Sequence, residues 1–427
     1  MLPMKKLLWL GLFFMGLLTA CGGTPAGDFP ALHFTTRYDP FAVARTFWHD
    51  AHLRVENPDG VVAFGAAVRL RGRGNSTWEH GAEKRPLRIR FAAPRPFLDA
   101  PHAAQDWVLI ANLFDPALMR THLAFDLGRR LDGLYWTPFS QFVHVYFNGE
   151  YQGVFQLADE RDIGPGRAQL QADPDPARSE FLLEISGSSP TRDRLLYEGQ
   201  IENIDFTFVN GWVIDVRYPH ARDRDGHLNY LQAFLYRVDA AIQSGNLEAV
   251  AALVDLPSLI DFYLVQEWFK DIDVSDRSIF MQIKGQGENR RLHFGPLWDF
   301  DRSAGNMSAW HSPHYLFAGH YNDWFAALLR IPAFHDLTAA RWQQIRHTAI
   351  PATLTYAQHL LTHYEQAFNR NFTHHHHIFN HPPHDPPAWF NMVGPPLRGL
   401  RTFREQAEYM IAWLETRAYW LDGFFGE

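Results

Sequence analysis

The segment from Phe294 to Asn306 reads Phe-Gly-Pro-Leu-Trp-Asp-Phe-Asp-Arg-Ser-Ala-Gly-Asn, so a strand-like run ends in two carboxylates, Asp299 and Asp301. Two oxygens at this spacing can hold a hard cation such as Mg²⁺, which is typical of phosphate chemistry. The same Asp-x-Asp pattern also occurs in solvated turns and helix caps. The neighbouring sequence must therefore distinguish a metal site from a turn.

The residues before this motif predict a helix with an acidic end. Asp255 is a good N-cap, Pro257 suits the first turn, and apolar side chains recur at helical spacing up to Trp268. The helix is expected to stop at Lys270-Asp271-Ile272-Asp273. An acidic turn should therefore follow the helix.

A β-hairpin is predicted next. Residues 278–284 have the period of a strand, 285–289 have the composition of a turn, and 291–294 resume the strand pattern. We expect Lys284 to pair with Arg290 across the turn. This pairing fixes which residues meet at the open end of the hairpin.

The expected register places Asp276 opposite Trp298 and brings Asp273 and Asp276 to the same end as Asp299 and Asp301. Cross-strand neighbours lie about 5 Å apart. Four carboxylates this close repel one another unless a cation or several donors compensate. A metal site thus becomes as good an interpretation as a turn.

The bulk composition indicates a large folded protein. With 427 residues, 46% of them hydrophobic and 15% aromatic, the chain can form a large core and two lobes or domains. Its net charge of −8 argues against a general nucleic-acid binder. We expect no nucleic-acid partner.

The start of the chain resembles a bacterial lipoprotein signal. Lys5-Lys6 precede an apolar run that is short for a membrane span, and Leu18-Thr-Ala-Cys21 resembles a lipobox. Cys21 is the only cysteine, which favours lipidation over ordinary signal cleavage. We predict a signal peptide over 1–21, a tether over 22–35, and an exported lipoprotein anchored to a membrane and facing the periplasm or cell surface.

The remaining sequence divides into a β-rich half, about 36–215, and a mainly helical half, about 216–427. Asn148-Gly149 predicts a hairpin turn. Residues 119–131 predict a helix packed on a sheet. We expect an α+β enzyme with two lobes and a cleft.

Basic segments in the first half supply candidate phosphate contacts. The glycines and arginines from Arg71 to Trp78 could bind phosphates, although a tight turn has the same composition. Arg88 and its neighbour Arg90 share one face of a strand. Asp159 or Glu160 could orient Lys84, or simply belong to a charged loop. His374 to His377 could bind a transition metal, but consecutive histidines mostly lack a fixed geometry.

Six segments, in this order, resemble the CotH kinase family, the atypical protein kinases typified by spore-coat protein H. They extend from about residue 40 to the helix around 413–421. The matching segments are Arg71-Gly-Arg-Gly-Asn-Ser-Thr-Trp78, Lys84-Arg-Pro-Leu-Arg-Ile-Arg90, Leu109-Ile-Ala-Asn112 with Met119-Arg120, Val145-Tyr-Phe-Asn-Gly-Glu-Tyr-Gln-Gly-Val154, Phe269-Lys-Asp-Ile-Asp273, and Phe294 to Asn306.

The resemblance implies an atypical, two-lobed protein-kinase-like fold that binds ATP with Mg²⁺, Mn²⁺ being an alternative, and phosphorylates Ser or Thr of surface or coat proteins. Asp273 would position or deprotonate the acceptor hydroxyl, and Asp299 with Asp301 would hold the metal. The nucleotide side would be formed by Lys84, Arg88, Arg73, and either Asp159 or Glu160.

Two departures from the family pattern bear on this function. Asp271 stands where members often have Asn, and Ala158-Asp159-Glu160 stands where Thr-Glu-Lys is common. An exported protein also meets little ATP. The alternative is a non-catalytic, kinase-like lipoprotein that assembles envelope proteins or binds surface polymers, for which the 14 Trp residues would be suited.

Overall fold

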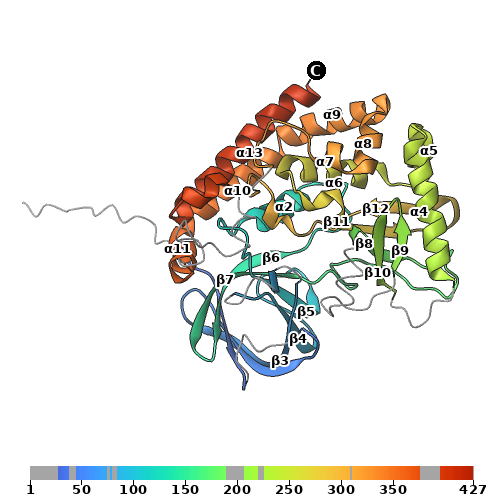
Figure 1. Ribbon diagram of the computed structural model, residues 1–427. Helices are drawn as coiled ribbons and strands as arrows, with labels where there is room; N and C mark the ends of the chain where they lie inside the picture. Colours follow the sequence, from blue (N-terminus) through green and yellow to red (C-terminus); the bar gives the residue numbers. More distant parts are fainter. Residues whose placement is uncertain are drawn as a thin grey trace, which may run out of the picture.

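The computed structural model describes residues 27–37, 45–74, 77–78, 84–188, 206–219, 226–307, 310–375 and 395–426. Over these residues the fold is mixed α+β, with two sheets and a group of helices (Figure 1). The predicted signal peptide with Cys21, and the histidines from His376 onward, lie outside the described residues.

Seven strands close into a barrel in the order β1, β2, β3, β4, β5, β7, β6. Neighbouring strands are antiparallel except β1 and β6, which run parallel and close the barrel. The barrel strands are β1 (Ala31–Thr35), β2 (His49–Glu56), β3 (Val62–Gly72), β4 (Leu87–Pro96), β5 (Ala103–Ile110), β6 (Ser140–Phe147) and β7 (Glu150–Asp159).

Part of the predicted tether belongs to the barrel. Residues 31–35 form β1, where Leu32 and Phe34 point into the barrel core. Alternating burial of two apolar side chains holds this short strand between β2 and β6. The tether prediction is therefore wrong for these five residues.

Alternation also determines what the barrel presents to its surroundings. Val68 and Leu70 on β3, with Leu87 and Ile89 on β4, fill the interior. The arginines between them therefore point outward, and Arg71 pairs with Arg88 across the two strands. The outer face of β3 and β4 is consequently basic.

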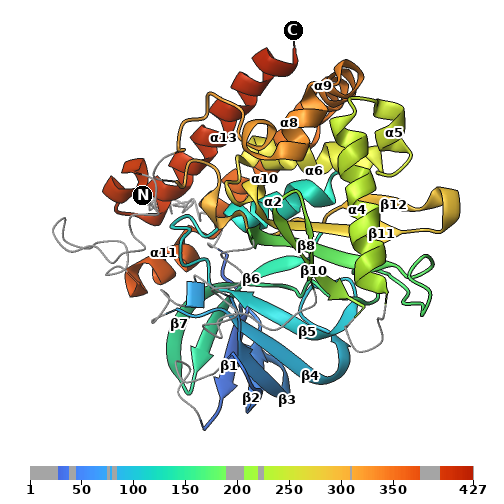
Figure 2. The same ribbon diagram turned by 45° about the vertical axis from the view of Figure 1, so that its right-hand side comes forward.

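The second sheet is antiparallel and takes strands from both halves of the chain, in the order β12-β11-β8-β10-β9. The division predicted near residue 215 stays a prediction, but this sheet crosses it. Helix α4 lies against the β9 edge (Figure 2). The strands are β8 (Phe181–Ser188), β9 (Phe206–Val209), β10 (Trp212–Tyr218), β11 (Arg277–Lys284) and β12 (Arg291–Phe294).

The helices surround a second core that is continuous with this sheet. Helix α2 lies between the barrel and the other helices, in contact with β6, α6 and α10. The helices are α2 (Arg120–Arg129), α4 (His227–Gln243), α5 (Leu247–Ala251), α6 (Leu256–Phe269), α7 (Ala318–Tyr321), α8 (Asp323–Leu329), α9 (Pro332–Arg346), α10 (Ala349–His363), α11 (Glu365–His374) and α13 (Phe403–Phe425), with short 3₁₀ turns η3 (Asp273–Ser275), η4 (Gly287–Asn289), η5 (Phe300–Arg302) and η7 (Pro395–Gly399).

Both predicted hairpins form, and the register of one of them differs by a residue. Asn148 and Gly149 have φ of 50° and 90° between β6 and β7, as a type I′ turn requires. In the other hairpin Lys284 pairs with Arg291 rather than Arg290. The loop that contains the 3₁₀ turn η4 covers residues 285–290, one residue more than expected, so the ladder begins one position later.

Candidate functional site

The acidic turn predicted after α6 is present. Lys270 ends α6 in a left-handed conformation, with φ of 51°. Its Nζ donates to the carbonyl oxygens of Trp310 at 2.8 Å and Ser312 at 2.6 Å, which ties the helix end to a distant loop. Asp271 and Asp273 follow, and Asp273 opens η3. The fixed end of α6 thus determines where Asp271 and Asp273 lie.

The second pair of carboxylates follows β12. Asp299 has φ of 68°, and its Oδ2 accepts a hydrogen bond from Ser278 Oγ at 3.2 Å. Asp301 is buried in η5, and Asn306 Nδ2 donates to its backbone carbonyl at 2.7 Å. The hairpin and the turn after it therefore determine where both side chains point.

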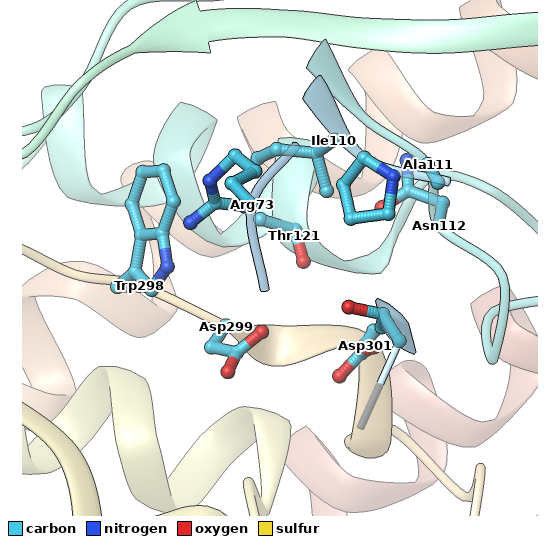
Figure 3. A pocket seen from close by; sticks show the side chains of 10 residues that line it. Arg73, Ile110, Ala111, Asn112, Thr121, Trp298, Asp299 and Asp301 are labelled. Atoms are coloured by element: carbon cyan, nitrogen blue, oxygen red, sulfur yellow. The ribbon is translucent and has the colours of Figure 1, made fainter. Parts of the chain in front are cut away.

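These two aspartates line a pocket between the barrel and the rest of the molecule (Figure 3). Its barrel wall, formed by Arg73, Pro86 and Ile110, comes from β3, β4, β5 and their loops. Its hairpin wall consists of Trp298, Asp299 and Asp301, and Arg73 faces the two carboxylates across the space. The remaining lining residues are Thr77, Ala111, Asn112 and Thr121.

The carboxylates of this region are buried close to one another, and their ionisation reflects it. The pKa of Asp273 is raised to about 6, mainly by burial and also by Asp299 and Asp276, whereas Arg302, 3.5 Å away, lowers it. Burial, then Asp299 and Asp273, raise the pKa of Asp301 well above its usual value. Burial and neighbouring carboxylates therefore disfavour the ionised forms of Asp273 and Asp301, which a bound cation would favour.

The arginines behind the barrel wall have the opposite effect on a carboxylate. The guanidinium carbons of Arg73 and Arg161 lie 5.3 Å and 4.5 Å from the centre of the Trp298 ring. Glu160 lies 3.4 Å from Arg88 and 3.5 Å from Arg161. Burial disfavours its ionisation, but Arg88, Arg161 and Arg73 outweigh that effect and lower its pKa. Glu160 is therefore ionised inside an arginine cluster.

Lys84 is buried and does not pair with either predicted carboxylate. Its Nζ donates to the carbonyl of Val154 at 2.6 Å, and burial lowers its pKa to about 7, against the effect of Asp115. Asp159 accepts a hydrogen bond from Arg167 Nε at 2.8 Å instead. The predicted orientation of Lys84 by Asp159 or Glu160 is thus not seen among the described residues.

Two further predicted groups have separate partners. Asp276 lies 2.9 Å from Arg277, so its carboxylate has a partner of opposite charge. His375 is buried, with Nε2 3.0 Å from the carbonyl of Gln152 on β7. The start of the histidine tract therefore packs on the barrel.

The sequence interpretation gave no role to Asn112, Thr121 and Arg120, although all three are near the pocket. Asn112 and Thr121 line it directly. Arg120 is fully buried against Asp115 and donates to the carbonyls of Ser303 and Ala304, just after the hairpin wall. For Asn112, the sequence did contain a signal, because a polar Asn directly follows an apolar strand.

The described residues limit what can hold a metal ion at this site. They contain no group of three or more His, Cys, Asp or Glu side chains placed to hold a metal ion. They also contain no helix that is long and apolar enough to cross a membrane. A cation at the two aspartates would therefore need oxygen ligands of another kind.

A closed β-barrel that meets a helical region at a pocket of mixed charge makes this a protein of the mixed α+β class. Within that class, the chain belongs to the CotH kinase protein family, whose model matches residues 70–421. This membership marks it as a kinase-like protein. No curated protein sequence matches the chain significantly.

Proposed function

We propose that this protein transfers a phosphoryl group from ATP to Ser or Thr of a protein substrate, with a divalent cation held at the pocket. The observation that supports the proposal most is the pocket itself, in which Arg73 faces Asp299 and Asp301. Phosphoryl transfer needs mainly positioning and charge neutralisation, and this pair of walls offers both signs of charge.

The residues present suit a hard cation. Asp299 and Asp301 are oxygen ligands of the type that Mg²⁺ and Mn²⁺ prefer. Burial and then the neighbouring Asp299 and Asp273 raise the pKa of Asp301, and a cation at the site would favour its ionised form. A bound Mg²⁺ would neutralise charge on the phosphates. Mg²⁺ commonly takes one or two carboxylates together with phosphate oxygens and water, so two aspartates are sufficient protein carboxylates.

The other roles follow from position and charge. Asp273 is expected to accept the proton of the acceptor hydroxyl, and its pKa of about 6 leaves it mostly ionised at neutral pH. Arg73 is expected to bind phosphate oxygens, because its pKa of about 10 keeps it charged. Arg88 contacts Asp106, Glu160 and Asp162, so we assign it to holding the arginine cluster as well as to the nucleotide side.

We also propose that the barrel and the helical region correspond to the two lobes of a kinase-like enzyme, with the pocket between them.

Cys21 lies outside the described residues, and its lipidation remains part of the proposal. Replacing Cys21 with Ser should move the expressed protein from the membrane fraction to the soluble fraction. Retention at the membrane would contradict the anchor.

Labelling with ATP tests the activity. The purified protein should label itself or an added acceptor protein in the presence of Mg²⁺ or Mn²⁺, and Asp299→Asn should remove all labelling. Circular dichroism of the variant verifies that the fold is intact. Unchanged labelling in Asp299→Asn would refute the metal role of the hairpin wall.

A second candidate is a non-catalytic, kinase-like module of the cell envelope. It is favoured by the absence, among the described residues, of a pair between Lys84 and Asp159 or Glu160, since kinases use a Lys–Glu pair to hold the nucleotide. Thermal-shift measurements separate the two, because a bound nucleotide stabilises by roughly 2.7 kcal/mol at a hundredfold excess over Kd. No shift with any nucleotide and metal would favour the module.

A further inference from the structure

Asn112 occupies the pocket together with the two aspartates of the hairpin wall. It lies just beyond the end of β5, with φ of 49°, and is 3% exposed. Asn112, Asp299 and Asp301 all line the same pocket, and Figure 3 shows them around one space. Asparagine tolerates the left-handed conformation better than most residues, so its presence here need not strain the backbone.

The hydrogen bonds of Asn112 determine which way its amide faces. Nδ2 donates to the carbonyl of Leu118 at 3.0 Å and to Gln156 Oε1 at 3.3 Å. A carbonyl oxygen can only accept, so the atom next to Leu118 must be the nitrogen. These two bonds therefore commit the nitrogen of the amide and leave its oxygen uncommitted.

Asn112 Oδ1 has no hydrogen-bond partner among the described residues. A buried acceptor without a donor is costly, and such groups in native proteins commonly mark a water or an ion. The same pocket is lined on the hairpin wall by the side chains of Asp299 and Asp301, which also carry oxygen ligands. Three side chains with oxygen donors around one space are suited to a hard cation, and Arg73 on the barrel wall remains available for phosphate oxygens.

The composition of the site leads to the same conclusion. Within the ranges that the structure describes, no third His, Cys, Asp or Glu joins Asp299 and Asp301 as a metal ligand. Hard cations readily take the side-chain oxygen of Asn beside carboxylates. Asn112 is the neutral oxygen donor that lines the pocket with its nitrogen already committed to other partners.

We propose that Asn112 Oδ1 is a third protein oxygen for the divalent cation assigned to Asp299 and Asp301. The inference rests on the cation site of the proposed function and adds a ligand to it. It also explains why a polar residue is kept at the end of an apolar strand, where its own hydrogen bonds satisfy only half of its amide.

Two substitutions separate a ligand from a structural residue. Asn112→Gly keeps the left-handed conformation and removes the oxygen, so cation binding should weaken about tenfold or more. Asn112→Asp keeps an oxygen and adds charge, so binding should tighten although both donor bonds of Nδ2 are lost. A residue that merely supports the loop would give weaker binding in both variants.

The test measures the affinity of the full-length protein for Mn²⁺. Electron paramagnetic resonance of the free ion reports the binding, with and without a non-hydrolysable ATP analogue. Gln266→Met serves as the matched control, because Gln266 on α6 is also a buried amide, with both polar atoms unpartnered among the described residues. Its affinity for Mn²⁺ should equal that of the wild type. Asp299→Asn is the reference for loss of the site.

The outcomes are distinct. Weaker binding in Asn112→Gly with tighter binding in Asn112→Asp supports the inference. Wild-type affinity in both, or weaker binding in both, overturns it while the cation site at Asp299 stands. If Mn²⁺ does not bind, or if Asp299→Asn binds it as the wild type does, the cation site of the proposed function fails and this inference fails with it.

Discussion

Behind the barrel wall of the pocket, a buried carboxylate lies among arginines. At the hairpin wall, two buried carboxyl groups lie near each other. Glu160 lies within 4 Å of Arg88 and Arg161, and these arginines lower its pKa despite its burial. At the hairpin wall, Asp299 adds to the effect of burial and raises the pKa of Asp301. Burial acts to raise the pKa of both carboxyl groups, but the neighbouring arginines reverse the net shift for Glu160 only. A counter-ion would therefore have its larger effect at the hairpin wall.

If the two walls depend on the same buried interior, replacing Arg120 should have the largest effect on stability. Arg120 and Asp115 are fully buried, and Arg120 also holds the backbone after the hairpin wall through Ser303. Arg120→Met should lower the free energy of unfolding by about 3–5 kcal/mol, because it leaves a buried carboxylate without its partner. Urea denaturation measures this loss.

The residue that caps the C-terminal end of the same helix supplies the control. Arg130 pairs with Asp126 at 2.8 Å, but its side chain is 37% exposed. Arg130→Gln should therefore cost only about 0–1 kcal/mol. Equal losses in the two variants would show that Arg120 does not hold the walls together.

The protonation state of Lys84 determines how much positive charge the barrel side carries. Its pKa is about 7 when folded and near 10.5 when unfolded, so between these values the unfolded chain binds a proton that the folded chain does not. Stability should therefore rise with pH above 7, by at most about 1.4 kcal/mol per pH unit from this group. Denaturation at pH 7 and 8.5 measures the gain in stability between these two values. In Lys84→Met this gain should be smaller by up to about 2 kcal/mol.

Lys270, whose pKa burial also lowers to about 7, contributes in the same direction in both proteins, so the difference between wild type and Lys84→Met isolates Lys84. Identical pH dependence in the two would mean that Lys84 stays charged. The barrel side would then have more positive charge than its hydrogen bonds suggest.

The smallest expected effect concerns repulsion at the hairpin wall. Asp301→Asn keeps the shape of the side chain and removes a buried charge, so the metal-free protein should become more stable by about 1 kcal/mol at neutral pH. The same variant should lose the stabilisation that Mn²⁺ gives to the wild type. Thermal denaturation with and without Mn²⁺ measures both.

Asp276→Asn is the comparison for this variant, since Asp276 is paired with Arg277 and partly exposed. Its stability should change by no more than about 0.5 kcal/mol. A stability loss in Asp301→Asn would mean that the carboxylates of the hairpin wall are already compensated in the metal-free protein.

Local patterns predicted the elements that local physics controls. The hairpin at Asn148-Gly149, helix α2 and helix α6 with its Asp255 cap all form. Closure of the barrel could not be predicted in this way, because the parallel pairing of β1 with β6 joins distant residues. The one-residue difference in the β11–β12 register has a local cause, the 3₁₀ turn η4, which the composition of the loop did not reveal.

The candidate site divides along the same line. Asp273, Asp299 and Asp301 come together because one helix and one hairpin deliver them, and both were visible in the sequence. The partners of Lys84 and Asp159 depend on which strands become neighbours in the barrel, and Val154 and Arg167 could not be named in advance. Asn112 was overlooked because a single amide at a strand end has no periodicity to mark it.

The second sheet has a consequence for how the chain is made. Strand β8 lies in its middle, and Ile185 pairs with Ile279, which is synthesised only after α4, α5 and α6. Until β11 appears, one edge of β8 is open to pairing with other chains. A prematurely ended chain would keep that edge exposed and would also lack Asp299 and Asp301. Completion of the second sheet by β11 and β12 and the arrival of the site's carboxylates therefore follow closely during synthesis, before α7 to α13 are made.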